Sequence, residues 1–173
     1  MQALTFWKLV IMDKANFLTE IIDLLNTEGI HYAVIGGQGV NAYAEPFVSL
    51  DLDLAIAVED LERVETALRA RFKAQRFPHS LNISQSDSEL RVQIQTDPRY
   101  AVFVERAQTR EVLGLSLPVA DVRDVLQGKI WAAQDSERRP SKRQKDLADI
   151  SRLLEQYPEL RELVPIDLLN RLL

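Results

Sequence analysis

Two aspartates separated by one residue form the pattern in this sequence that most clearly suggests chemistry. Asp51 and Asp53 alternate with leucines at the start of residues 50–58, a stretch typical of a β-strand. On a strand, side chains two positions apart point the same way, with Cα atoms roughly 6 to 7 Å apart. Carboxylates so placed can bridge Mg²⁺ ions that chelate phosphates. An exposed edge strand with an acidic face is the alternative, but the apolar residues 55–58 favour a central strand.

A pair of glycines lies upstream of the aspartates. Gly36 and Gly37 follow the apolar residues 32–35, a pattern typical of a buried strand that enters a tight turn, and residues 38–44 can form one or two helical turns. Such a turn exposes backbone N–H groups that can receive a phosphate. Most glycine pairs are simply turns, so this pair suggests a phosphate site only in combination with the aspartates.

Charged residues occur within the apolar faces of two predicted helices. Lys129 lies near the middle of the apolar stripe of residues 121–134, and Asp146 lies on the apolar face of residues 141–156. A buried charge is costly unless it is paired, so each of these residues could pair with an opposite charge in a cleft. The alternatives are a lysine whose stem crosses the apolar face and an aspartate that the helix dipole favours near a helix start.

The elements that must position these residues follow from the periodicity of the sequence. The patterns predict helices at residues 13–27, 59–72, 121–134 and 141–156, a short helix after Pro165, and strands at residues 32–35, 50–58 and 89–95. This mixture predicts an α/β (α+β) fold. We expect a core at residues 1–119 and a C-terminal helical portion at residues 120–173 packed on it. The loop at residues 135–140 is the best place for a boundary between the sheet part and a helical tail.

Composition places the chain among soluble globular proteins. It has 173 residues, of which 46% are apolar, and a net charge of −5. Apolar stretches fall short of the roughly 20 residues of a membrane span. The absence of cysteine excludes disulfides and thiolate zinc sites, so we expect a cytoplasmic protein without membrane partners. Net acidity argues against a surface that grips nucleic acid throughout. The basic residues 138–145 are interpreted as a solvated connection between helices, with a local binding patch as the alternative.

Taken together, the motifs resemble a known family. Gly36-Gly37 followed by Ser49-Leu50-Asp51-Leu52-Asp53-Leu54 resembles the Gly-Gly and (Ser/Thr)-x-Asp-x-Asp motif of the DNA polymerase β-like nucleotidyltransferase superfamily. With residues 107–115, the helix that carries Lys129 and the segment at residues 145–150, the chain is similar to the AbiEii type of nucleotidyltransferase. Members of this type include toxins of type IV toxin-antitoxin systems. The resemblance covers roughly residues 15–155 and implies a mixed sheet flanked by helices.

The resemblance implies a role for each motif residue. Asp51 and Asp53 would bind the metal, and Gly36, Gly37 and Ser49 would contact the triphosphate. Lys129 would neutralise phosphate charge, and Asp146 would complete the catalytic site. The implied activity transfers a nucleoside monophosphate from a nucleoside triphosphate to RNA, protein or a small molecule. Mg²⁺ or Mn²⁺ is the implied cofactor, and an antitoxin protein is an implied partner.

Two residues depart from the pattern of the family. Many members have an arginine shortly before the Ser/Thr, where this chain has Phe47, and a third carboxylate on a later strand, where this chain has Gln93. Glutamine substitutes poorly for a carboxylate that bridges metals or accepts a proton, and Asp97 could take over only on a longer strand. The alternative functions are therefore a non-catalytic relative that binds nucleotide or regulates, and an RNA-binding partner that uses the basic residues 138–145.

Overall fold

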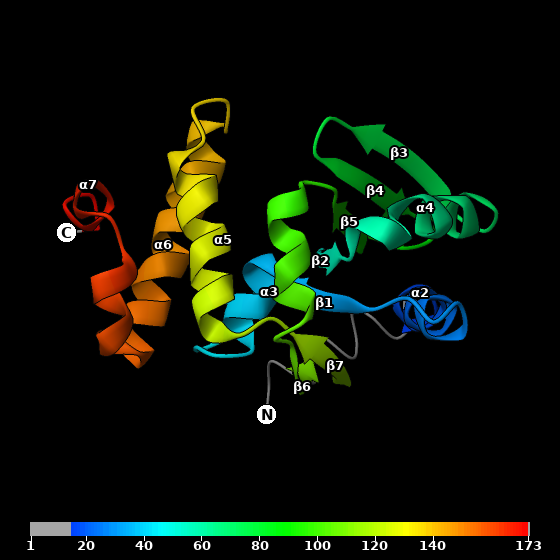
Figure 1. The fold of residues 1–173 in the computed structure, drawn as a ribbon, viewed down its shortest axis with the longest axis horizontal. Helices are drawn as coiled ribbons and strands as arrows, with labels where there is room; N and C mark the ends of the chain where they lie inside the picture. The colour runs from blue at the N-terminus through cyan, green and yellow to red at the C-terminus, as the bar shows by residue number, and fades with distance from the viewer. Residues whose placement is uncertain (1–14, 173) are drawn as a thin grey trace.

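The fold is built on one mixed β-sheet. The computed structural model describes residues 15–172, in which the sheet has seven strands in the order β3-β4-β5-β2-β1-β7-β6 (Figure 1). In chain order the strands are β1 (Tyr32–Ile35), β2 (Asp51–Ile56), β3 (Lys73–Phe77), β4 (Ser80–Ser84), β5 (Arg91–Gln95), β6 (Gln108–Val112) and β7 (Leu115–Val119). Each end of the sheet is an antiparallel hairpin, and the central strands β5, β2 and β1 lie between the two hairpins.

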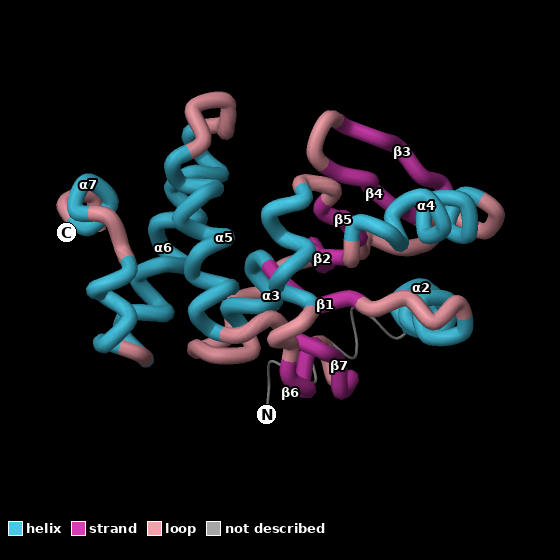
Figure 2. The backbone as a smooth tube through the Cα atoms, in the orientation of Figure 1, coloured by secondary structure: helices cyan, strands magenta, loops and turns pink. Residues whose placement is uncertain are grey.

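Helices lie on both sides of the sheet. They are α2 (Ala15–Thr27), α3 (Gly36–Asn41), α4 (Leu61–Arg69), α5 (Val122–Gln134), α6 (Pro140–Gln156) and α7 (Ile166–Leu169), with 3₁₀ turns η1 (Val58–Asp60), η2 (Pro98–Val104) and η3 (Pro158–Leu163). Figure 2 shows α5 and α6 as a helical hairpin on one side of the molecule, with α2 and α4 on the other. The predicted α/β fold with C-terminal helices is confirmed. The division of the chain after residue 119 stays a prediction.

Elements with strong periodicity were predicted correctly, with small differences at their ends. The predicted first helix begins within the described residues at Ala15, while Asp13 and Lys14 lie outside them. The predicted helix at residues 59–72 is a 3₁₀ turn followed by a shorter α4. Asp121 is the N-cap of α5, because its carboxylate accepts a hydrogen bond from the N–H of Arg123 at 2.9 Å.

The two outer hairpins were missed by the sequence analysis. Strand β3 is largely exposed and lacks alternation, so its sequence Lys-Ala-Gln-Arg-Phe gives no strand signal. Strand β7 contains Pro118, a residue that is rare within strands because it cannot donate to the ladder. Both hairpins are held by their pairing with the central strands, which is a tertiary effect.

The central strands β2 and β5 carry polar residues on one face and apolar residues on the other, whereas β1 is apolar and buried throughout. In β2, Leu52 and Leu54 are fully buried, while Asp51 and Asp53 lie on the opposite face and are half-buried. Strand β1 runs antiparallel to β2 and places Ile35, its last residue, opposite Asp53. The turn that leaves β1 therefore starts beside the second aspartate.

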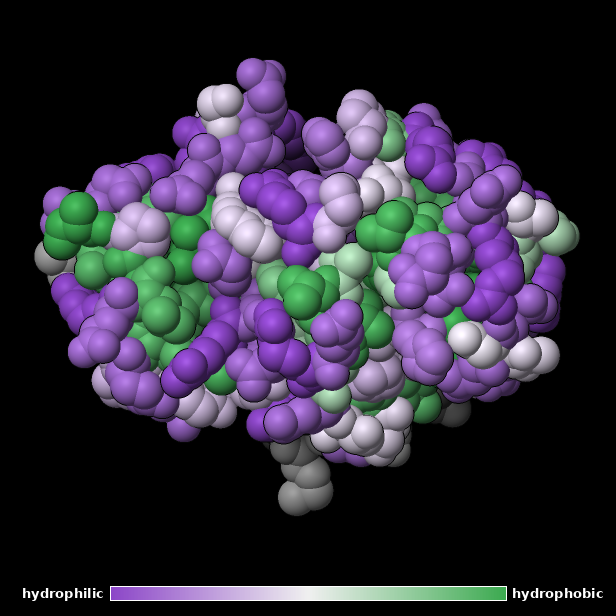
Figure 3. Space-filling view, in the orientation of Figure 1, coloured by the Kyte–Doolittle hydropathy of each residue, from purple (hydrophilic) through white to green (hydrophobic). Residues whose placement is uncertain are grey.

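The outer surface carries some apolar side chains. On the face seen in Figure 3, apolar surface gathers over the C-terminal helices, and Leu163 of η3 and Ile166 of α7 are exposed in this part of the chain. Scattered exposed apolar residues are ordinary in folded proteins. Among the elements that the structure describes, no helix is both long and apolar enough to cross a membrane.

The turn between β6 and β7 allows a test of local backbone strain. Leu113 and Gly114 connect the paired residues Val112 and Leu115, and both have positive φ, of 52° and 80°. A side chain at Gly114 meets open space, so Gly114→Ala costs only conformational energy. We expect the free energy of unfolding in urea to fall by about 1 kcal/mol. Gly37→Ala, at a helical position with open space, should not lower it; equal values for both variants would contradict the prediction.

Candidate functional site

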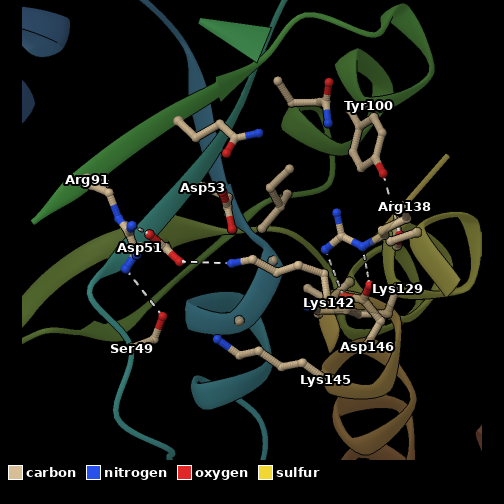
Figure 4. A pocket seen from close by; sticks show the side chains of 18 of the residues that line it. Ser49, Asp51, Asp53, Arg91, Tyr100, Lys129, Arg138, Lys142, Lys145 and Asp146 are labelled. Carbon is tan, nitrogen blue, oxygen red and sulfur yellow. Dashed lines mark hydrogen bonds and ion pairs between the residues drawn. The ribbon is translucent and has the colours of Figure 1, made fainter. Parts of the chain in front are cut away.

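A cleft lies between the central strands and the α5–α6 hairpin. Its volume is about 340 Å³, and Figure 4 shows side chains from the sheet and from both helices that face it. Every residue that the sequence analysis assigned to the site lines this cleft: Gly36, Gly37, Ser49, Asp51, Asp53, Lys129 and Asp146. The fold thus brings together residues that are more than a hundred positions apart in the chain, whereas their individual roles stay predictions.

Asp51 and Asp53 have different electrostatic surroundings. Asp51 forms ion pairs with Arg91 at 2.7 Å and with Lys142 at 3.8 Å. Within residues 15–172, the carboxylate of Asp53 has no hydrogen bond or ion pair of its own. Burial raises the pKa of Asp53 to about 6; the charge of Lys129 lowers this pKa, and that of Asp51 raises it further. Asp53 is therefore an under-compensated carboxylate, a group that favours a cation.

The raised pKa of Asp53 has a measurable effect on stability. The carboxyl titrates near 3.8 in the unfolded chain and near 6 in the fold, so the fold holds the proton more tightly and loses stability as the pH rises between these values. The cost above this window is at most about 3 kcal/mol, and contact with solvent reduces it. In urea with EDTA, we expect Asp53→Asn to be about 1–2 kcal/mol more stable than wild type near pH 7.5 and to lose this advantage near pH 4.

A suitable control for this effect is Asp167→Asn, which changes an exposed aspartate in the C-terminal part of the chain. It should have the same stability as wild type at both pH values. The prediction is wrong if Asp53→Asn is equal to or less stable than wild type near pH 7.5.

The turn after β1 fits tightly against Asp53. Gly36 has φ of +63°, and a Cβ atom at this position would lie 2.2 Å from Oδ2 of Asp53. Any side chain there would displace the carboxylate. Gly37 faces open space, so its backbone is accessible from the cleft. The motif glycines thus serve two needs, close packing against the aspartate and an unobstructed backbone.

Ser49 is fixed at the start of β2. Its side chain is buried, and its Oγ accepts a hydrogen bond from the N–H of Asp51 at 3.2 Å. Its carbonyl oxygen accepts a hydrogen bond from Nε2 of Gln38 in α3 at 3.0 Å. The loop between α3 and β2 therefore places Ser49 beside the aspartates with little freedom.

Lys129 and Asp146 are partners in one buried network. Nζ of Lys129 lies 3.1 Å from Oδ1 of Asp146 and 2.7 Å from Oδ2 of Asp149, and Arg138 also contacts the carboxylate of Asp146. Burial lowers the pKa of Lys129, but the charges of Asp149 and Asp146 outweigh burial and leave this pKa raised. Both alternatives from the sequence, a stem that merely crosses the apolar face and a helix-start aspartate, are therefore wrong. Asp149 belongs to the segment at residues 145–150 that the resemblance includes, but the sequence did not indicate it as a partner of Lys129.

The basic residues 138–145 join α5 to the start of α6 and are largely exposed to solvent, as interpreted from the sequence, but several of them also line the cleft. Arg138, Arg139, Lys142 and Lys145 all line the cleft, and Figure 4 shows Lys142 and Lys145 extending from α6 toward the strand with the aspartates. Arg143 holds the turn between the helices, because its guanidinium donates to the carbonyls at positions 135, 136 and 138. Arg138 lies in the turn before α6, and nothing in the sequence signals its place in the cleft.

Gln93 lies directly beside Asp53 in the sheet. In the parallel pairing of β2 and β5, Gln93 is the direct partner of Asp53, and on its other side it pairs with Asn82 of β4. All three side chains line the cleft. Within residues 15–172, no cluster of three or more His, Cys, Asp and Glu side chains suits a metal. The two aspartates alone still fit a divalent cation, because their oxygens are hard ligands and Asp53 lacks a compensating partner.

Comparisons with known proteins identify the family and show similar folds. The family model described as "Nucleotidyl transferase AbiEii toxin, Type IV TA system" matches residues 43–173. The fold is similar to that of ANT(2″)-Ia in complex with adenylyl-2″-tobramycin, with a TM-score of 0.63 and 11% identity over 90% of this chain and 97% of that one. It is also similar to the lincomycin-bound lincosamide antibiotic adenylyltransferase LnuA (TM-score 0.54, 13% identity, 79% and 95% covered).

A further similar structure is JHP933 from Helicobacter pylori, with a TM-score of 0.51 and 18% identity over 92% of this chain and 71% of that one. Identities this low show likeness of fold alone. Among curated protein sequences, none matches this chain.

Proposed function

The chain belongs to the AbiEii family of nucleotidyl transferases, since the family model matches well over half of it, and from this premise we propose that it transfers a nucleoside monophosphate. The donor is a nucleoside triphosphate, the acceptor is RNA, a protein or a small molecule, and pyrophosphate is released. The observation that carries the proposal is the cleft in which the glycine turn, Ser49, both aspartates and several cationic side chains meet. Positioning and charge neutralisation, which dominate such transfers, need this combination.

Asp51 and Asp53 are the residues that would hold Mg²⁺ or Mn²⁺. The ion, when bound, neutralises phosphate charge and stabilises the oxygens of an in-line displacement. Gly37 offers its open backbone, and Ser49 its hydroxyl, to the triphosphate, while Gly36 lets the turn approach Asp53. The unpaired carboxylate of Asp53 supports this assignment of the metal ligands.

Cationic side chains on the helical wall supply the remaining charge neutralisation. Lys129 is held in place by two carboxylates. Arg138 reaches the same cleft from the turn before α6, and Lys142 and Lys145 reach it from the first turns of that helix. Lys142 approaches Asp51 only to 3.8 Å, so this weak pair can give way when a phosphate and a cation bind. Asp146 positions Lys129 and Arg138 through its ion pairs and completes the site in this way.

Within this function we propose the toxin role of the family, with an antitoxin protein as its counterpart and with RNA as one acceptor. The family description supports the first part. The basic residues of α6 at the mouth of the site support an acceptor that carries phosphates, because clustered lysine and arginine side chains are what binds a phosphate backbone.

A second candidate is a nucleotide-binding module without turnover, and one observation favours it. Gln93 stands directly beside Asp53, where it cannot accept a proton from an acceptor or add a negative ligand for a metal. Such a module would retain nucleotide binding in the cleft and regulate or interact with a partner.

Incubation with labelled nucleotides distinguishes the two functions. Purified protein would be incubated with Mg²⁺ or Mn²⁺ and each labelled nucleoside triphosphate, alone and with total RNA. We expect label on the protein or on RNA, or a labelled small-molecule product, for at least one nucleotide. Metal-dependent binding without transfer would support the non-catalytic module, and absence of binding would contradict both.

A further inference from the structure

Arg152 of α6 occupies a buried position behind the cleft. Its side chain is only 9% exposed and is not among those that line the cleft. Its Nη1 donates to Oδ1 of Asp149 at 2.7 Å, and its Nη2 donates to Oδ1 of Asn41 at 2.7 Å and to the carbonyl oxygen of Glu45. One guanidinium thus joins α6, the end of α3 and the loop that follows α3.

The loop that Arg152 contacts is the one that carries Ser49. Oδ1 of Asn41 accepts a hydrogen bond from the N–H of Phe47 at 2.9 Å, and Nδ2 of Asn41 donates to the carbonyl oxygen of Phe47 at 2.7 Å. The guanidinium of Arg152 also lies over the ring of Phe47, 4.0 Å from its centroid. Because Ser49 follows two residues later, these contacts limit where Ser49 can stand in the cleft.

On its other side, Arg152 is connected to the cleft through Asp149. This carboxylate lies between Arg152 and Lys129, at 2.7 Å from each of them. Such a bridge neutralises the buried carboxylate from both sides and fixes its orientation. The same guanidinium is therefore connected to the ammonium group of Lys129 on the helical side of the cleft and to the loop that carries the hydroxyl of Ser49 on the strand side.

We propose that Arg152 is a positioning residue for nucleotide binding. It fixes the loop of Ser49 directly and Lys129 through Asp149, and it touches no nucleotide itself. This inference rests on the proposed function, because it assumes that Ser49 and Lys129 contact the triphosphate. It explains why an arginine is buried in α6: the planar fork can serve a carboxylate, an amide oxygen and a backbone carbonyl at once, which the single ammonium of lysine cannot do.

The test uses Arg152→Lys, which keeps a positive charge beside Asp149 while it loses the fork to Asn41 and Glu45. Binding of ATP, GTP, CTP and UTP, each with Mg²⁺, would be measured by titration calorimetry on the full chain. For a nucleotide that wild type binds, we expect the Kd to rise about tenfold in Arg152→Lys. Ser49→Ala should raise the Kd about tenfold in wild type but less than about twofold in the Arg152→Lys background.

Two further variants separate positioning from general stability. Arg69→Lys is the control for the exchange of side chain, because Arg69 also joins a carboxylate one helical turn away, Glu65, to a backbone carbonyl, that of Ala74, at an exposed site that does not line the cleft; its Kd should equal that of wild type. Phe47→Ala removes the stacked ring at an exposed position, so it leaves the core intact. It should raise the Kd about threefold in wild type and have no effect in Arg152→Lys.

The outcomes are distinct. Unchanged Kd values for Arg152→Lys and Phe47→Ala, or additive effects of Arg152→Lys and Ser49→Ala, would overturn the inference and leave the proposed function standing. A wild-type protein that binds none of the four nucleotides would overturn the proposed function and the inference with it.

Discussion

Replacing both Asp51 and Asp53 with asparagine is expected to lower nucleotide transfer by about a thousandfold or more. Loss of a single preorganised electrostatic partner of a transition state costs about a hundredfold to a thousandfold, and this double variant removes both proposed ligands of the cation. Asparagine keeps the shape of the side chain, and neutral residues relieve the uncompensated charge at Asp53, so the fold should persist. The measurement is the initial rate of label transfer with Mg²⁺ and with Mn²⁺.

The control for this variant changes the charge by the same amount elsewhere. Asp87 and Asp167 are both exposed and lie outside the cleft. The double variant Asp87→Asn with Asp167→Asn should transfer label at the wild-type rate. If the Asp51 and Asp53 variant also kept this rate, the assignment of the two aspartates as metal ligands would be wrong.

The second large effect is expected in the opposite direction, at Gln93. Gln93→Asp places a carboxylate on the strand next to that of Asp53, with Cα atoms roughly 5 Å apart across the ladder. The new group can accept the proton of the acceptor and share a cation with Asp53. General base catalysis contributes about a hundredfold or more, so we expect the transfer rate to rise by about a hundredfold. The same labelled-nucleotide assay measures this change.

Gln95→Asp is the matched control for Gln93→Asp. Gln95 lies on the same face of β5 and lines the same cleft, but its partner in β2 is Ala55, so a carboxylate there stands farther from Asp53. It should leave the rate within about twofold of wild type. An unchanged rate in Gln93→Asp would show that the chain does not lack a third carboxylate. Activity gained from an inactive wild type would identify the natural protein as a non-catalytic module.

Much of the cleft could be predicted because its residues lie on elements with strong periodicity. The alternation of β2 determines which face carries Asp51 and Asp53, and the glycine pair marks the end of β1. The helical period of α5 and α6 also showed that Lys129 and Asp146 lie on apolar faces and need an explanation. Local patterns therefore sufficed to predict that these residues are candidates for the site.

The partners across elements could not be predicted, because they depend on how α5 and α6 dock on the sheet. The pairing of Lys129 with Asp149, and the position of Arg138 over the cleft, arise only from the turn between the two helices. The contact of Arg152 with Asn41 likewise joins residues far apart in the chain. A single sequence contains no signal for the register between two such surfaces, so it shows the charges at residues 138–145 but not their place in the cleft.

The close contact between Gly36 and Asp53 has a consequence for how this site can evolve. A side chain at position 36 would need the space that the carboxylate occupies, so the two positions should change together rather than independently. A lineage that lost the aspartate would be released from the need for glycine, and its turn could drift to any residue that tolerates the backbone. Because the φ of +63° disfavours other residues at position 36 even without the aspartate, the glycine should be lost only after the aspartate among diverging descendants.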